Sequence, residues 1–235
     1  MPDTSKCVAE NHAQVMDQIE AACRRAGRES DSVAMVAVTK YAELDWVRAL
    51  MELGVRELGE NRPQQLVERA QQLSDDVHWH LIGHLQRNKV RPILPVTTLM
   101  HSIDSTRLLS RIDLLAAELN LHPRILLEVN VSGENVKDGF RCEELVENWD
   151  QVLAARHVQI SGLMTMAPYT SNSEDSRPVY RGLRDLRDRL TAMSPTTLCL
   201  SELSMGMSGD FDVAIEEGAT IIRVGRRLFR GLRDA

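Results

Sequence analysis

Hydrophobic residues in this chain gather in short runs, and the stretches between the runs carry apolar residues at helical spacing. Most runs are nearly free of charge, which is typical of strands buried on both faces of a parallel sheet. The runs begin near residues 33, 55, 78, 98, 124, 158, 196 and 219. Eight alternating strand and helix units in 235 residues predict an α/β fold, a single closed (β/α)8 barrel over residues 1–235.

One further helix is expected before the first strand. Apolar residues recur at helical spacing from Val8 to Ala22, and Gly27 offers a stop, so the helix should cover residues 7–26 and pack under the barrel as a lid or base. An open doubly wound sheet is the alternative fold. That fold usually carries a glycine-rich turn after its first strand, and the sequence VAVTKYAELD has no glycine there, so the barrel is favoured.

Composition narrows the class of protein. The apolar fraction of 43% suits a sizeable core, and the net charge of -6 argues against a general nucleic-acid binder. We expect a cytoplasmic protein without a membrane segment, because no apolar stretch could span a bilayer and the amino terminus lacks a secretory pattern. The four cysteines have no CxxC spacing, so reduced, mostly buried thiols are expected, with neither a disulfide framework nor a zinc ribbon.

The first apolar run, residues 33–40, ends on a lysine. Lys40 would lie at the carboxyl end of a buried strand, and in α/β barrels that end faces the ligand. Partial burial would lower the pKa of this lysine, and its free amine could form a Schiff base with a carbonyl. Taken alone, an ordinary solvated lysine is the better interpretation.

Two loops later in the chain suggest an anion site. Ser204, Gly206, Ser208 and Gly209 are expected to follow the seventh strand, and the sequence RVGR at 223–226 to follow the eighth and open a helix. Glycines let backbone N–H groups approach an anion, hydroxyls donate to it, and a helix amino terminus adds positive partial charge. The motif is weak alone, but with Lys40 opposite it implies a ligand with both a carbonyl and a phosphate.

Other strand ends should meet on the same face of the barrel. They include Asn61, His80, the loop around Lys137, and the segment 164–168. His78 and His80 share one face of a strand, and we expect hydrogen-bonded core or pocket histidines there rather than metal ligands.

Eight ordered sequence blocks carry a resemblance to a known family. The blocks are AVTK at 37–40, GEN at 59–61, WHLIGHLQ-x-NK at 79–89, HSID at 101–104, VNVSGEN-x-K-x-GF at 129–140, GLMTMAP at 162–168, LSMGMSGDF at 203–211 and IRVG at 222–225. From about residue 7 to residue 231 the chain resembles the YggS/PROSC family of pyridoxal 5'-phosphate homeostasis proteins, which are related to the barrel domain of bacterial alanine racemase.

The resemblance implies a cofactor site. Lys40 would carry pyridoxal phosphate as a Schiff base, Ser208, Gly225 and the backbone at Arg226 would hold the phosphate, and Arg223 would lie near the pyridine nitrogen. Asn61 and His80 would line the pocket. The full expected cofactor-binding set is Lys40, Asn61, His80, Met164, Ser204, Ser208, Arg223, Gly225 and Arg226.

Two positions depart from the family pattern. Arg226 stands where the family often has a serine or threonine, so a hydroxyl donor is lost while a backbone N–H and a guanidinium remain. Tyr41 follows the lysine in place of a frequent KP-containing segment, and this change affects the rim of the expected pocket.

The expected function is a non-catalytic carrier of pyridoxal phosphate in intracellular vitamin B6 homeostasis, with transient contact to apoenzymes. No catalytic residue and no metal is assigned. A racemase needs a second base from a further domain, for which the chain leaves no room after Ala235, and Arg223 would not protonate the pyridine ring. With no second domain to build an active site shared between subunits, we expect a monomer.

Two enzyme classes stay open as alternatives. A pyridoxal-phosphate racemase or lyase comes second, with Tyr41 or Tyr169 as conceivable bases, and a Schiff-base aldolase comes third. Lys137 could accept the cofactor during exchange, although a solvated loop lysine is the more ordinary interpretation.

Overall fold

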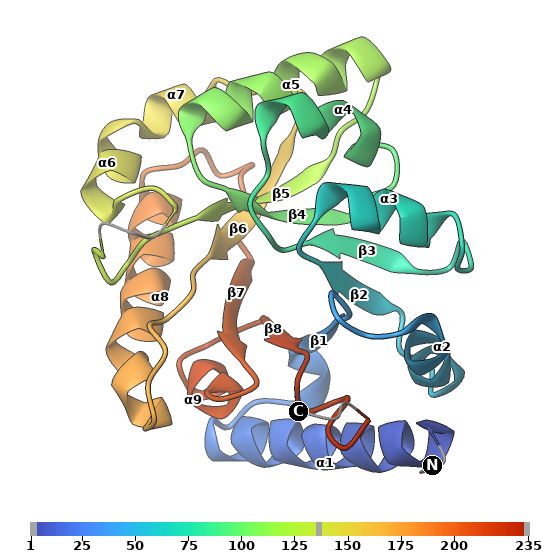
Figure 1. Ribbon diagram of the computed structural model, residues 1–235. Coiled ribbons are helices and arrows are strands. Elements are labelled where there is room, and N and C mark those ends of the chain that lie inside the picture. The colour runs from blue at the N-terminus through green and yellow to red at the C-terminus, as the bar shows by residue number, and fades with distance from the viewer. Residues whose placement is uncertain (1–3, 135–137, 233–235) are drawn as a thin grey trace.

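The computed structural model describes residues 4–134 and 138–232. Within these residues, eight parallel strands pair in chain order and β8 returns to β1, which closes the barrel and confirms the predicted fold (Figure 1). The strands are β1 (Ala34–Val38), β2 (Glu57–Glu60), β3 (His78–Leu81), β4 (Leu99–Ile103), β5 (Arg124–Glu128), β6 (Gln159–Met164), β7 (Glu202–Met207) and β8 (Ile221–Val224).

Helices form a ring outside the strands, each with its apolar face turned to the barrel. They are α1 (Thr4–Arg25), α2 (Leu44–Glu52), α3 (Pro63–Ala70), α4 (Val90–Ile93), α5 (Thr106–Leu119), α6 (Cys142–Glu147), α7 (Trp149–Leu153), α8 (Arg177–Ala192) and α9 (Phe211–Glu216). Short 3-10 helices precede β1, α4 and α8, namely η1 (Ser30–Ser32), η2 (Arg87–Lys89) and η3 (Ser173–Ser176). Ser105 caps α5 as its sequence predicts, since its hydroxyl accepts from the N–H of Leu108.

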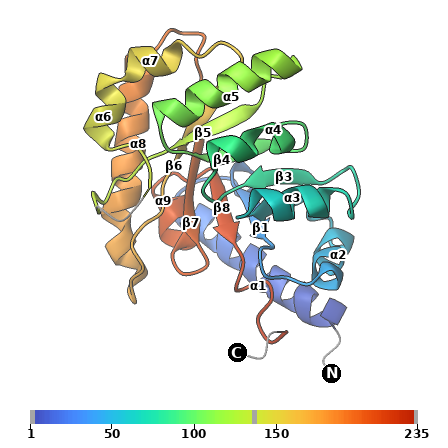
Figure 2. The ribbon, with the colours of Figure 1, turned by 45° about the horizontal axis from the view of Figure 1, so that its top comes forward.

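The first helix does not lie under the barrel as a lid or base. α1 packs on the side of the barrel against α2 and α9, which places it in the position of a helix following β8 (Figures 1 and 2). Residues 226–232 form turns instead of the expected closing helix, because α1 already covers this seam. The Asn11 amide donates to the carbonyl oxygens of Leu228 and Arg230, at 3.2 and 2.9 Å, and so ties these turns to α1.

Three other boundaries differ from the sequence prediction. The sequence over residues 143–155 predicts one helix, but the structure divides it at Asn148, whose side chain donates to the Glu144 carbonyl oxygen and competes with the helical hydrogen bonds. A short helix predicted over residues 86–91 should end before Pro92, but Pro92 lies inside α4, because the first turn of a helix does not use the N–H that proline lacks. β7 begins at Glu202, so Ser204 and Gly206 belong to the strand and not to the loop after it.

The cysteines are all free thiols, but Cys23 is the one that is fully buried. Cys7 and Cys142 are half-buried and Cys199 is exposed, so the expectation of mostly buried thiols is wrong. No helix in the described parts of the chain combines the length and the apolar character that crossing a bilayer requires.

The close pairing of β6 with β7 requires a residue without a Cβ atom at Gly162, which pairs with Glu202. A Cβ atom at this position would lie 1.9 Å from the Glu202 carbonyl oxygen, so the two strands would have to separate. We expect Gly162→Ala to lower the free energy of unfolding by roughly 2–3 kcal/mol, as overpacking does in other cores. Gly209→Ala is the matched control in urea unfolding, because a Cβ there would meet no atom within 4 Å. Equal stability of the two variants would contradict this account of the β6–β7 contact.

Candidate functional site

A cavity of about 680 Å³ opens at the carboxyl ends of the strands. This is a size typical of sites for small ligands and cofactors. Six residues of the sequence-predicted set line it, namely Lys40, Asn61, Ser208, Arg223, Gly225 and Arg226. They lie at or just after the carboxyl ends of β1, β2, β7 and β8. Because the barrel closes between β8 and β1, the first and the last strands of the chain contribute to the same cavity.

Lys40 stands directly after β1 and is half-buried. The Gln65 amide donates to its carbonyl oxygen at 3.2 Å, and its Nζ lies 5.2 Å from the centre of the Tyr41 ring. Behind it, the Thr39 hydroxyl donates to the buried Glu60 carboxyl at 2.6 Å. These contacts hold the backbone of the strand end while the lysine side chain faces the cavity.

The part of the cavity wall formed by the loops after β7 and β8, next to β1, is rich in hydrogen-bond donors. The Ser208 hydroxyl accepts from the Gly225 N–H at 3.3 Å, which joins the loops after β7 and β8. The buried Asp210 carboxylate shapes the first of these loops by accepting from the Met207 N–H at 2.8 Å. Within the described residues, no hydrogen bond occupies the backbone N–H of Gly209 or Arg226, and both residues line the cavity. This wall can therefore bind an anion through backbone N–H groups, a hydroxyl and the Arg226 guanidinium.

Arg223 forms part of the cavity floor and is buried, with 4% of its surface exposed. One guanidinium nitrogen, Nη1, donates to Ser204 Oγ at 2.5 Å, and Nη2 donates to the Thr165 carbonyl oxygen at 2.9 Å. Burial lowers the pKa of this guanidinium, an effect that the carboxyl groups of Glu128 and Asp210 oppose. Arginine remains a hydrogen-bond donor only, so the floor presents a fixed cation to any ligand.

Three predicted residues do not line the cavity. Met164 packs with Val36 and Leu99 in an apolar cluster, and Ser204 and His80 lie deeper, in a hydrogen-bonded chain below Arg223. Lys137 lies outside the described residues.

Glu128, at the end of β5, lines the cavity and was not anticipated from the sequence. It is 5% exposed, and burial together with the nearby charges of Asp104 and Asp138 raises its pKa to about 7. The signal that could have found it is an acidic residue inside the apolar run RILLEVNV. The position of Glu128 at the end of β5 places its carboxyl in the barrel, and packing of the apolar core does not require a carboxyl there.

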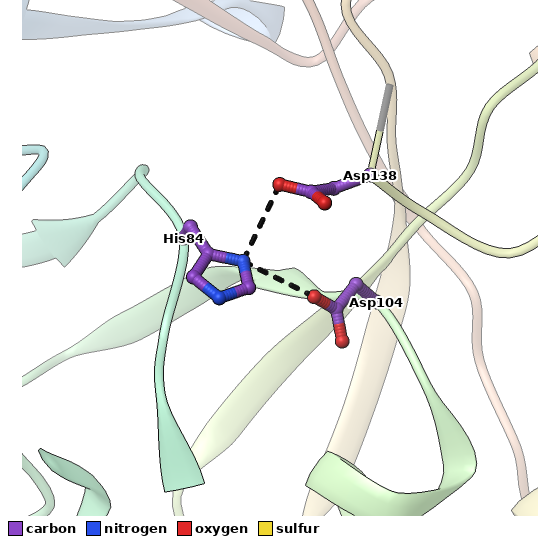
Figure 3. Close-up of side chains that lie close together, drawn as sticks. All are labelled: His84, Asp104 and Asp138. Atoms are coloured by element: carbon purple, nitrogen blue, oxygen red, sulfur yellow. Dashed lines mark ion pairs between the residues drawn. The ribbon is translucent and has the colours of Figure 1, made fainter. Parts of the chain in front are cut away.

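A histidine and two aspartates meet at one edge of the cavity (Figure 3). His84 Nδ1 lies 3.3 Å from a carboxylate oxygen of Asp104 and 3.3 Å from one of Asp138. Among the described residues, this is the group whose ligand atoms approach closely enough to hold a metal ion, all within 4.8 Å of one another. The same contacts are those of ion pairs between His84 and the two aspartates, and the side chains of His84 and Asp138 are mostly exposed.

Comparison with known proteins agrees with this architecture. The family model described as alanine racemase, N-terminal domain, matches residues 14–232. A pyridoxal phosphate homeostasis protein from Aquifex aeolicus is 41% identical over 221 residues, which cover 94% of this chain and 96% of that protein. Among solved structures, a protein described as unknown from Bifidobacterium adolescentis is 34% identical with a TM-score of 0.91, covering 97% of each chain.

A further solved structure is PipY from Synechococcus elongatus, described as having PLP bound. It is 34% identical, has a TM-score of 0.83, and the match covers 94% of this chain and 99% of PipY. The chain belongs to the pyridoxal phosphate homeostasis protein family. The barrel of this family is that of the alanine racemase amino-terminal domain.

Both departures from the family pattern lie at the cavity. Tyr41, which is 62% exposed, and the exposed side chain of Arg226 stand on its rim. Since the helix expected to begin at RVGR is absent from the described residues, no helix dipole supports an anion there. The backbone N–H of Arg226 nevertheless has no hydrogen-bond partner among the described residues, so it can donate to an anion.

The raised pKa of Glu128 predicts a pH-dependent effect on stability. A carboxyl whose pKa is about 7 when folded and 4.5 when unfolded destabilises the native state as pH rises through that interval. We expect Glu128→Gln to raise the free energy of unfolding at pH 8 by up to about 3 kcal/mol, and to change it little at pH 4–5. Urea unfolding at both pH values measures this difference, with Glu147→Gln, an exposed position on α6, as the control. A difference that does not change with pH would contradict the assignment.

Proposed function

We propose that this protein binds pyridoxal 5'-phosphate through Lys40 and acts in its homeostasis as a reversible, non-catalytic carrier. The observation that supports it most is the arrangement of the cavity, in which a lysine that follows β1 and anion-binding donors after β7 and β8 line the same space. When bound, the cofactor supplies an aldehyde, which can form a Schiff base with a lysine amine, and a phosphate. The family relationship and PipY with PLP bound support the same ligand.

The residues present fit such a ligand. Gly209 and Arg226 offer unoccupied backbone N–H groups, and the Ser208 hydroxyl can donate to a phosphate oxygen while accepting from Gly225. Charge-assisted hydrogen bonds of this kind are about twice as strong as neutral ones. The Arg226 guanidinium adds a positive charge at the rim, and its side chain is free to move because it is exposed.

The charges of the site favour holding a cofactor over chemistry upon it. Arg223 is fixed on the cavity floor and donates only, so beside a pyridine nitrogen it would supply a hydrogen bond without giving up a proton. An unprotonated pyridine withdraws electrons poorly, which disfavours carbanion chemistry. Tyr41 and Tyr169 also line the cavity, but they are 62% and 89% exposed, so neither hydroxyl is buried in a fixed position as a second base. Contact with apoenzymes and a monomeric state belong to this proposal.

Replacement of Lys40 tests the covalent attachment. Wild-type protein loaded with pyridoxal phosphate should be yellow, and borohydride reduction should fix the cofactor on the peptide that contains Lys40. Lys40→Ala should lose the yellow absorption, because no other amine of the described residues lines the cavity. Absorption spectra and peptide mass mapping measure both results. Racemisation of an amino acid by the wild type would instead favour the enzyme alternative, and labelling at another lysine would refute the attachment.

Replacement of Ser208 tests the phosphate wall. Loss of one hydroxyl donor to a charged group should weaken pyridoxal phosphate binding about tenfold, consistent with the usual strength of such bonds. Affinity for pyridoxal, which lacks the phosphate, should stay the same. Ser201→Ala is the matched control, since Ser201 is exposed before the amino end of β7, far along the strand from the cavity. Equal losses for both ligands would show that Ser208 acts on folding or on the lysine instead.

A further inference from the structure

A chain of hydrogen-bonded side chains runs through the inside of the barrel, away from the cavity floor. Arg223 on β8 contacts Ser204 on β7, Ser204 Oγ lies 2.8 Å from His101 Nδ1, and His101 Nε2 lies 2.8 Å from His80 Nδ1. His80 Nε2 is 2.5 Å from a carboxylate oxygen of Glu57. The contact between Ser204 on β7 and His101 on β4 joins strands that are not neighbours in the sheet, so the chain crosses the barrel interior.

The chain also extends along the barrel axis. Glu57 is the first residue of β2, whereas Arg223 lies near the carboxyl end of β8. Ser204 and His101 have no exposed surface and His80 is 4% exposed. Bulk water therefore does not form hydrogen bonds with the Ser204 hydroxyl or the histidine ring nitrogens. Each of these groups must be paired with another member of this series of side chains.

The charges at both ends limit how the hydrogens can be arranged. Burial would raise the pKa of Glu57, but the hydrogen bonds from His80 and His78 outweigh this and the net pKa is lowered, so Glu57 is an ionised acceptor. His80 must then donate through Nε2. Burial and the nearby positive charges lower the pKa of His101 well below its ordinary value, so His101 is neutral and carries one ring hydrogen.

Only two arrangements remain, and they differ at Ser204. If His80 is neutral, His101 donates to it through Nε2, Ser204 donates to His101 Nδ1, and Ser204 Oγ accepts from Arg223. If His80 is protonated, His101 donates to Ser204 instead, and the buried Ser204 hydroxyl hydrogen has no acceptor among the described residues. An unpaired buried donor destabilises the native state, so the first arrangement is favoured.

We propose that Ser204, His101, His80 and Glu57 form a positioning relay that fixes Arg223 on the cavity floor, with both histidines neutral and carrying their hydrogen on Nε2. Every donor and acceptor along the relay is then used, and all the hydrogen bonds point from the cationic Arg223 to the anionic Glu57. His80, His101 and Glu57 would thus affect a ligand in the cavity without touching it. The effect of these residues on a ligand rests on the proposed function, whereas the arrangement of the hydrogens does not.

Nitrogen-15 NMR of protein labelled at histidine tests the arrangement without any cofactor. The unliganded wild type at pH 7 should show one protonated and one unprotonated ring nitrogen for both His80 and His101, with the hydrogen on Nε2. The variants His80→Gln and His101→Gln assign the two signals. A doubly protonated His80, or the hydrogen of His101 on Nδ1, would overturn the proposed relay.

A matched pair of variants at position 101 tests the effect on the cavity. The carbonyl oxygen of asparagine can take the place of Nδ1 and accept from Ser204, whereas the amide of glutamine reaches only the Nε2 position toward His80. His101→Asn should keep pyridoxal phosphate affinity within about threefold, and His101→Gln should weaken it about tenfold and shift the absorption of the bound cofactor. His122→Gln, at an exposed position, is the control.

The outcomes separate the relay from the proposed function. Equal affinity losses in the two His101 variants, with both folded by circular dichroism, would refute positioning through Ser204, and so would no loss in either. If the wild type binds no pyridoxal phosphate, the proposed function fails while the NMR result still decides the hydrogen arrangement.

Discussion

The pairing of β8 with β1 is the constraint on which the site depends. It sets Val36 beside Arg223, so the strand that ends in Lys40 lies next to the strand that ends in Gly225. A Cβ atom at Gly225 would stand 3.2 Å from the backbone oxygen of Val38, closer than a side chain normally comes, so glycine suits this seam. Because α1 covers the outside of the same seam, the chain after β8 is free to form turns. Arg226, the first residue of these turns, lines the cavity, and its N–H has no hydrogen-bond partner among the described residues.

Hydrophobic periodicity was sufficient to predict the barrel, because strands covered on both faces appear in sequence as uninterrupted apolar runs. It could not place α1, since a helical pattern shows which face is buried and not what covers that face. It also placed the seventh strand too early. The apolar sequence TTLCL precedes β7, while β7 itself carries the small and polar residues Ser204 and Gly206 because it faces a polar interior.

The rule that ligands lie at the carboxyl ends of strands brought six predicted residues to the cavity and failed at three. A strand rises about 3.3 Å per residue, so a residue two or three positions before the end lies one layer deeper. Ser204 is such a residue, three positions before the end of β7, whereas His80 stands one position before the end of β3 with its ring bonded to His101 inside the barrel. Glu128 was missed because a single acidic residue in an apolar run does not show whether its carboxyl faces a cavity. That becomes clear only when the neighbouring strands are known. The pKa of Glu128 is raised because this ionisable group occupies a buried strand position.

Electrostatics inside the barrel connect the fold to the proposed function. Exclusion of water from the barrel interior strengthens each hydrogen bond between the polar side chains there and makes each unpaired polar group costly, so a series of polar side chains persists only if every member is paired. A complete chain beneath Arg223 holds that side chain in one orientation, and a fixed donor at the floor of the site favours a ligand that accepts a hydrogen bond there. In the proposed function, retention by Lys40 and the phosphate wall, with two exposed tyrosines at the rim, would give a site that binds strongly yet stays open to exchange. A carrier needs both properties, whereas a racemase would need a second base held as firmly as Arg223 is held here.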